Sequence, residues 1–223
     1  MRKWSWLAII TLISVMVICT ILRIEQTALF TFFAAVIAII PFFISYEQKK
    51  PKPRDLMPVV VLSALAVAGR ILFAALPNFK PVTAIVIIAG MAFGSESGFM
   101  TGALSGLVSN LFFGQGPWTP WQMLAWGLIG FIAGILSEKN ILAKPWSIFL
   151  YGILASFGFG LFMDTWNILG FVQPLNYKNI ISAYLLGIPF NISHAVSTVI
   201  FLLPVYKTWL CQLKRIKLKF NLK

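Results

Sequence analysis

The stretch GMAFGSESGFMTGALSGLVSNLFFGQGPWTPWQMLAW, residues 90–126, decides the fold of this chain. It begins with glycines at every fourth position, namely Gly90, Gly94, Gly98, Gly102 and Gly106. In a helix, this spacing leaves a strip without side chains along which a neighbouring backbone can approach closely, the usual way of packing helices in lipid. We therefore predict that this stretch packs helix against helix within a membrane domain.

The second half of the stretch cannot continue a helix. Residues 114–122 read GQGPWTPWQ, and the two glycines and two prolines fix the backbone of a short loop. One interpretation is a turn at the membrane interface with an aromatic belt. The other is a rigid polar and aromatic lid beside a ligand cavity. Both interpretations stay open at this point.

The composition is that of a membrane protein. Of the 223 residues, 59% are hydrophobic and 11% are charged, whereas a soluble domain is typically about 25% charged. The two cysteines, Cys19 and Cys211, suggest neither a disulfide framework nor a metal site. Residues 1–20 lack a convincing cleavage site and precede a second apolar run, so we expect a retained helix rather than a signal peptide.

We predict an all-α polytopic membrane protein with about eight transmembrane helices. A spanning helix needs about 20 apolar residues, and six candidates are residues 4–22, 27–45, 57–76, 121–136, 146–169 and 181–205. As one helix, residues 81–113 would be about 50 Å long, too long for the bilayer core. We therefore predict two helices that turn at Ser95–Ser97, with the first buried among its neighbours.

A basic, proline-broken linker marks the clearest boundary. It covers residues 46–56 and separates two N-terminal helices, residues 1–45, from a six-helix substrate-binding membrane domain, residues 57–206. Residues 207–223 form a basic cytoplasmic tail in this division. A net charge of +12 is compatible with nucleic-acid binding, but its distribution along the chain favours a role in membrane topology, and we expect no nucleic-acid partner.

Lysine and arginine set the expected orientation. With the N-terminus inside, the cytoplasmic segments hold 14 of the 18 basic residues, namely Arg2, Lys3, Lys49, Lys50, Lys52, Arg54, Lys139, Lys144, Lys207, Lys214, Arg215, Lys217, Lys219 and Lys223. We therefore predict a multi-pass protein of the cell membrane with both termini cytoplasmic. The tail then contacts anionic lipid headgroups, and the loop at residues 114–120 faces outside.

Two charged residues fall within predicted helices, where charge is costly and often functional. Arg70 lies on the outer half of the third helix and Asp164 on the outer half of the seventh. They either pair and fix the helix register, or line a polar cavity open to the outside.

Amide and indole side chains gather at the same level, and we predict a substrate site there. With Arg70 and Asp164, its members are Asn110, Gln115, Trp118, Trp121, Gln122, Trp126 and Asn167. Such groups suit recognition of a large, neutral solute with a polar rim, although interhelical hydrogen bonding is the alternative for each amide.

Catalysis is disfavoured. His194 is the only histidine, so a multi-histidine metal site is excluded, and we expect no catalytic residue, metal or cofactor. No H-E-x-x-H, G-x-S-x-G or Walker-type glycine loop occurs. We expect His194 to be a hydrogen-bonded contact between helices. Without a nucleotide-binding loop, the chain cannot itself hydrolyse ATP.

The region 57–205 resembles the S component, the substrate-binding subunit of energy-coupling factor (ECF) vitamin transporters. The resemblance rests on Ala64-x-x-x-Ala68 in the third helix, on the glycine hairpin 94–106 and on the loop 114–122. Within the family, the chain most resembles the S components for cobalamin or related corrinoids.

The resemblance implies a transport role without chemistry on the solute. A vitamin binds at the extracellular side, and the Ala64/Ala68 face docks onto a transmembrane coupling subunit that carries two ATPase subunits. S components usually have six helices, so the two extra N-terminal helices must leave Ala64 and Ala68 exposed. The alternative is a stand-alone integral membrane enzyme or a facilitator, which would need no such partners.

Overall fold

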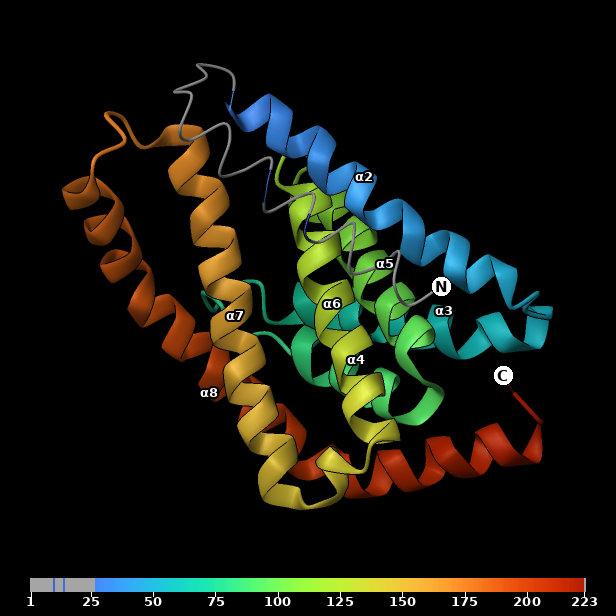
Figure 1. Ribbon diagram of the computed structural model, residues 1–223. Helices are drawn as coiled ribbons and strands as arrows, with labels where there is room; N and C mark the ends of the chain where they lie inside the picture. The colour runs from blue at the N-terminus through green and yellow to red at the C-terminus, as the bar shows by residue number, and fades with distance from the viewer. Residues whose placement is uncertain (1–9, 11–13, 15–26, 223) are drawn as a thin grey trace.

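The computed structural model describes residues 10, 14 and 27–222, and these are helical with short connections (Figure 1). The α-helices are α2 (Thr27–Gln48), α3 (Pro53–Leu72), α4 (Val82–Phe93), α5 (Ser95–Phe113), α6 (Thr119–Glu138), α7 (Pro145–Phe171) and α8 (Tyr177–Lys219), with a short 3-10 helix, η1 (Ile141–Ala143). The first predicted helix, residues 4–22, lies outside the described residues except for Ile10 and Ser14.

Five helices of the described part are long and apolar enough to cross a membrane, namely α2, α3, α6, α7 and α8. This supports a polytopic membrane protein, with fewer such spans in residues 27–222 than the eight predicted for the whole chain. The helix α4 has only 12 residues, and serines, glycines and an asparagine make α5 less apolar than the five spans.

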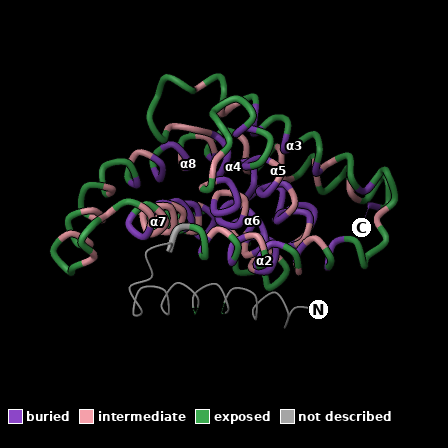
Figure 2. Tube along the Cα trace, turned by 90° about the horizontal axis from the view of Figure 1, so that it is seen from above, coloured by how far each residue is buried: buried purple, intermediate pink, exposed green. Residues whose placement is uncertain are grey.

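The short helix α4 lies at the centre of the bundle. All its residues are buried, and Figure 2 shows it enclosed by other helices. The prediction of a buried helix here is confirmed. The turn differs from the prediction, because Ser95–Ser97 already belong to α5 and the chain reverses at Gly94. Gly94 has φ +100°, which other residues adopt only with strain.

Glycines bring the backbones of α4, α5 and α6 into contact. A Cβ on Gly90 or on Gly98 would overlap the carbonyl oxygen of Gly130, and one on Gly130 would overlap that of Gly98. A Cβ on Gly102 would overlap the carbonyl oxygen of Trp126. The predicted close approach along the glycine strip is therefore confirmed for Gly90, Gly98 and Gly102, and its partner is the backbone of α6.

The N-terminal helix α2 packs against α5, α6 and α7. Phe42 stacks on Phe99 with ring centroids 4.0 Å apart and an interplanar angle of 3°, and it meets the ring of Phe131 edge-on at 5.1 Å. These aromatic contacts fix α2 on one side of the bundle.

The last helix is longer than predicted. It runs from Tyr177 to Lys219 and contains Pro189 and Pro204. It first lies antiparallel to α7 and then turns to run beneath the bundle (Figure 1). The residues predicted as a tail are thus helical as far as Lys219, because Trp209, Leu210 and Leu213 pack against the core.

Candidate functional site

Arg70 and four polar residues meet where α3 and α5 end and α6 begins. Arg70 Nη1 donates to Ser109 Oγ and, at 2.8 Å, to Asn110 Oδ1. Asn110 Nδ2 donates to Thr119 Oγ1 at 3.0 Å and to Gln122 Oε1 at 2.9 Å. We call Arg70, Ser109, Asn110, Thr119 and Gln122 the Arg70 cluster. The structure therefore brings together three of the predicted site residues, Arg70, Asn110 and Gln122.

The loop beside the cluster is closed by its own hydrogen bonds. Gln115 Nε2 donates to the carbonyl oxygen of Leu107 at 2.9 Å, and Gln115 Oε1 accepts from Thr119 Oγ1 at 2.9 Å. The helix α6 begins at Thr119, with Pro120 in its first turn, where the missing N–H is harmless. Trp121 and Gln122 are helical, as predicted for residues 121–136, and the helix begins two residues earlier than predicted.

Aromatic rings flank the guanidinium group. Arg70 Cζ lies 4.7 Å from the ring centroid of Phe113 and 5.0 Å from that of Trp126. Trp126 in turn stacks on Phe159, with centroids 4.6 Å apart and an interplanar angle of 25°. This arrangement suits cation–π attraction, which strengthens as the cation is desolvated.

A series of buried hydrogen bonds holds the indole N–H of Trp126. Trp126 Nε1 donates to Thr83 Oγ1 at 3.2 Å, and that hydroxyl is 2.8 Å from His194 Nε2. The ring of His194 also meets Phe159 edge-on. The prediction that His194 is a hydrogen-bonded helix contact is confirmed.

Asp164 lies in a separate contact between α7 and α8. It accepts a hydrogen bond from Asn191 Nδ2 at 3.0 Å and sits against Gly187, where a Cβ would overlap the carboxylate. Within the described residues Arg70 and Asp164 form no ion pair. The predicted pairing is therefore absent. Asn167, also on α7, is exposed.

The remaining predicted tryptophans face α7. Trp118 and Trp166 lie 6.0 Å apart edge to face, and Trp121 lies 4.8 Å from Phe162. The indole N–H groups of Trp121 and Trp166 are buried and find no acceptor in the described part of the chain. The predicted site residues thus fall into three groups, around Arg70, Trp121 and Asp164.

Several residues around Arg70 were not predicted to belong to the site, and only some of them could have been recognised from the sequence. Thr83 is the one polar residue in the apolar run of α4, and such a residue in a buried helix usually has a partner. Ser109 precedes Asn110 and is fully buried. Phe113 and Phe159 are ordinary apolar residues in sequence, so nothing distinguished them from core residues.

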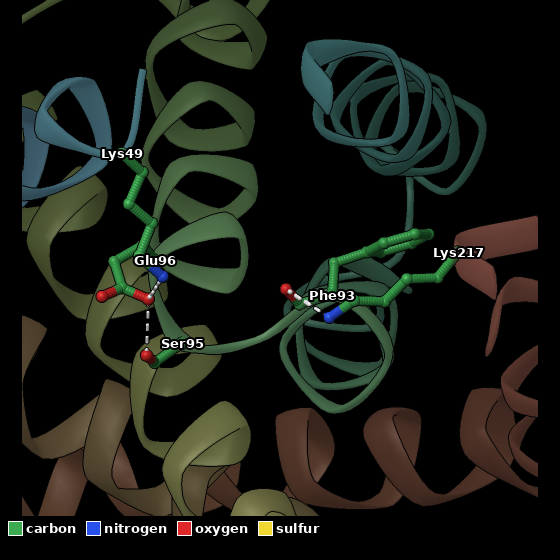
Figure 3. A network of polar contacts seen from close by, with 5 residues as sticks. All are labelled: Lys49, Phe93, Ser95, Glu96 and Lys217. Atoms are coloured by element: carbon green, nitrogen blue, oxygen red, sulfur yellow. Dashed lines mark hydrogen bonds and ion pairs between the residues drawn. The ribbon is translucent and has the colours of Figure 1, made fainter. Parts of the chain in front are cut away.

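The opposite end of the bundle carries a second polar network, shown in Figure 3. Lys49 Nζ and Glu96 Oε2 form an ion pair at 2.9 Å, and Ser95 Oγ donates to the same oxygen at 2.8 Å. Lys217 Nζ donates to the carbonyl oxygen of Phe93 at 3.3 Å. The ends of α2 and α8 therefore both hold the α4–α5 turn.

An apolar surface extends along α3. Ala64 and Ala68 are exposed, and so are the larger side chains of Met57, Val60, Val61 and Leu65. A groove of about 440 Å³ continues this surface, lined by side chains that include Met57, Val61, Phe93, Leu213 and Phe220. Because α2 packs elsewhere, it leaves this face free.

Residues 50–209 match the family model described as ECF-type riboflavin transporter, S component. This match covers well over half of the chain. The chain belongs to this family. The family description names riboflavin, so membership supports the predicted S component but not the predicted cobalamin type. Lys49 and Lys217, which hold the α4–α5 turn, lie outside the matched range.

Two curated relatives match a smaller part of this S component. A UPF0397 protein of Vibrio atlanticus (strain LGP32) is 28% identical over 100 residues, and one of Aliivibrio salmonicida (strain LFI1238) is 30% identical over 100 residues. Each match covers 40% of this chain and 54% of the relative, so the chain spans about half the length of these relatives. No solved structure matches the chain.

Proposed function

We propose that this chain is the substrate-binding subunit of an ECF-type vitamin importer. The vitamin binds at the extracellular end of the bundle, beside the Arg70 cluster. The observation that carries the proposal is the convergence there of one cation, two amides and two aromatic faces. Such a mixture suits a ring-bearing solute with polar edges, and it agrees with the family of the chain.

The transport step needs partners. A transmembrane coupling subunit docks on the exposed Ala64/Ala68 face of α3, and two ATPase subunits drive the reorientation that releases the vitamin inside. Small residues on a helix face let a partner helix approach closely. The chain itself binds and releases the solute, and ATP hydrolysis takes place on the ATPase subunits.

Riboflavin is the first candidate for the ligand. The family description names it, and its flat ring system matches the aromatic faces of Phe113 and Trp126. The amide of Gln122 is suited to the hydrogen-bonding edge of such a ring, and the buried amide of Asn110 holds it in place. In the same site, Gln115 and Trp118 contribute the loop that covers the ligand.

Cobalamin or a related corrinoid is the second candidate. It is favoured by the resemblance of the chain to the S components for corrinoids, and its amide-rich rim would meet the amides of the loop. In this version of the site Asp164 and Asn167 extend the contact surface along α7, and the buried ring of Trp121 supports it from within.

The test is binding of both vitamins to the purified protein in detergent, without partner subunits. The visible spectrum of the purified protein comes first, because flavins and corrinoids absorb differently. Titration with riboflavin and with cobalamin follows. Saturable binding of either one supports the proposal and identifies the ligand, and a folded protein that binds neither contradicts it.

A matched pair of tryptophan variants tests the place of the site. Trp126→Phe removes the hydrogen bond to Thr83 and weakens the cation–π contact with Arg70, so we expect vitamin affinity to fall about tenfold, or ~1.4 kcal/mol. Trp146 is exposed at the start of α7, and Trp146→Phe should leave the affinity unchanged. Equal affinities in the two variants would place the ligand elsewhere.

A further inference from the structure

Arg70 has hydrogen-bonding capacity that the protein does not use. Both of its hydrogen bonds come from Nη1 and go to neutral acceptors, Ser109 Oγ and Asn110 Oδ1. In the described part of the chain, Nε and Nη2 donate to no acceptor, and neither of these atoms is sealed from solvent. A guanidinium group presents its N–H donors in a fixed fork, so part of this fork faces open space.

Within the described residues, the positive charge of Arg70 is also not balanced by a carboxylate. Asp164, an acidic residue that the topology places at the same end, is bonded to Asn191. Glu96 pairs with Lys49 at the opposite end of α5. The nearby Lys80 adds a second cation, whose ammonium group donates to the carbonyl oxygens of Phe73 and Leu76. An unbalanced charge within a membrane domain is costly, and an anion would offset this cost.

The aromatic rings fix the direction of the free donors. With Phe113 and Trp126 both within 5.0 Å of Cζ, and with Nη1 held by α5, the guanidinium plane has little freedom to turn. A planar, immobilised fork is the arrangement that binds carboxylate and phosphate groups through two parallel hydrogen bonds.

We propose that Arg70 binds an oxyanion of the transported solute, a phosphate or a carboxylate. The preferred solute therefore carries an anionic group, so flavin mononucleotide rather than free riboflavin is the expected flavin ligand, in contrast to the neutral solute expected from the amides and indoles in the sequence. This inference rests on the proposed function, and it narrows the class of substrate. Asn110 and Ser109 act as positioning residues, because they hold the guanidinium group rather than the anion.

The test compares ligands that differ in a phosphate group. Riboflavin and flavin mononucleotide differ by one phosphate, and cobinamide lacks the phosphate-bearing nucleotide part of cobalamin. Affinities of all four are measured by titration in neutral detergent. We expect either the flavins or the corrinoids to bind. Within the pair that binds, the affinity for the phosphate-bearing ligand should be higher by about tenfold or more.

Two substitutions of Arg70 and one control substitution test whether Arg70 causes the preference for the phosphate-bearing ligand. Arg70→Gln should reduce the preference to about one, and Arg70→Lys, which keeps the charge but loses the fork, should leave a smaller preference than the native protein. Lys178→Gln removes an exposed cation in the first turn of α8, outside the Arg70 cluster, and should keep the preference. Thermal unfolding of each variant shows whether it is folded, and Arg70→Lys carries the test if Arg70→Gln does not fold.

The outcomes separate the two proposals. If riboflavin or cobinamide binds as tightly as its phosphate-bearing partner, or if Arg70→Lys leaves the preference intact, the oxyanion site is wrong and the importer function stands. If none of the four ligands binds, both proposals fail. Added phosphatidylglycerol that abolishes the preference would mean that Arg70 binds a lipid phosphate rather than the solute, which also overturns the inference.

Discussion

At the residue scale, glycine spacing and buried charge were the most informative signals. The period of four in residues 90–106 predicted close backbone contact, and Gly90 and Gly98 do meet Gly130. Arg70 and Asp164 were correctly singled out as unusual, but they have different partners. Sequence indicates the depth of a residue along a helix, whereas the direction it faces depends on how the helices are rotated against each other.

The backbone contact at Gly98 predicts that an added methyl group lowers stability at this glycine but not at Gly158. Gly98→Ala would force the backbones of α5 and α6 apart, and we expect it to destabilise the protein by about 1–3 kcal/mol, as overpacking typically does. Gly158→Ala is the control, because a Cβ at Gly158 on α7 meets no atom within 4 Å. Thermal unfolding in detergent measures both. A Gly98→Ala variant as stable as Gly158→Ala would contradict the three-helix contact.

At the scale of single elements, the hydrophobic runs predicted which segments are helical but not the residues at which the helices begin and end. The helix α6 begins at Thr119 rather than at the predicted residue 121, because Pro120 fits the first turn of a helix. The predicted last helix, residues 181–205, continues to Lys219 despite Pro204. Apolar side chains after this proline recur on one side of the helix and pack on the core, which compensates for the lost backbone hydrogen bond.

The exposed face of α3 predicts a variant that binds vitamin but does not transport it. Ala64→Trp places a large side chain on the surface proposed for docking of the coupling subunit, so uptake by cells that express all subunits should be lost. Vitamin binding by the purified protein should be unchanged, because Ala64 lies away from the Arg70 cluster.

The control for this variant is Leu154→Trp, on an exposed position of α7. It adds a similar bulk to the surface and should support normal uptake. If Ala64→Trp transports as well as this control, the docking face lies elsewhere on the protein.

At the scale of the whole molecule, the two ends of the bundle carry different polar networks. The Arg70 cluster lies at one end, and the Lys49–Glu96 and Lys217–Phe93 contacts hold the α4–α5 turn at the other. The basic residues at this second end agree with a cytoplasmic location. The final part of α8 crosses beneath the bundle and covers apolar side chains there (Figure 1).

Two leucines near the C-terminus, Leu218 in the last turn of α8 and Leu222 just after the helix, test whether this end of the chain packs on the core. Leu222 is 9% exposed and belongs to the core, whereas Leu218 is 82% exposed. We expect Leu222→Ala to destabilise the protein by about 2–3 kcal/mol and Leu218→Ala to have little effect, as measured by thermal unfolding. Vitamin affinity should be unchanged in both variants because the Arg70 cluster is at the other end. Equal stability of the two variants would show that the segment is not packed on the core.

The sequence by itself determined the membrane class, the helices of the described part and the composition of the polar end, because these depend on hydrophobic runs, breakers and residue types along the chain. It also predicted that the helix of residues 82–93 would be buried, since a helix of that length cannot cross a bilayer alone. Only the tertiary structure decided that Arg70 meets Asn110 and Gln122 while Asp164 meets Asn191. Those contacts depend on the rotation of each helix about its axis, which is set by backbone contact at glycines and by the packing of rings such as Phe42 on Phe99.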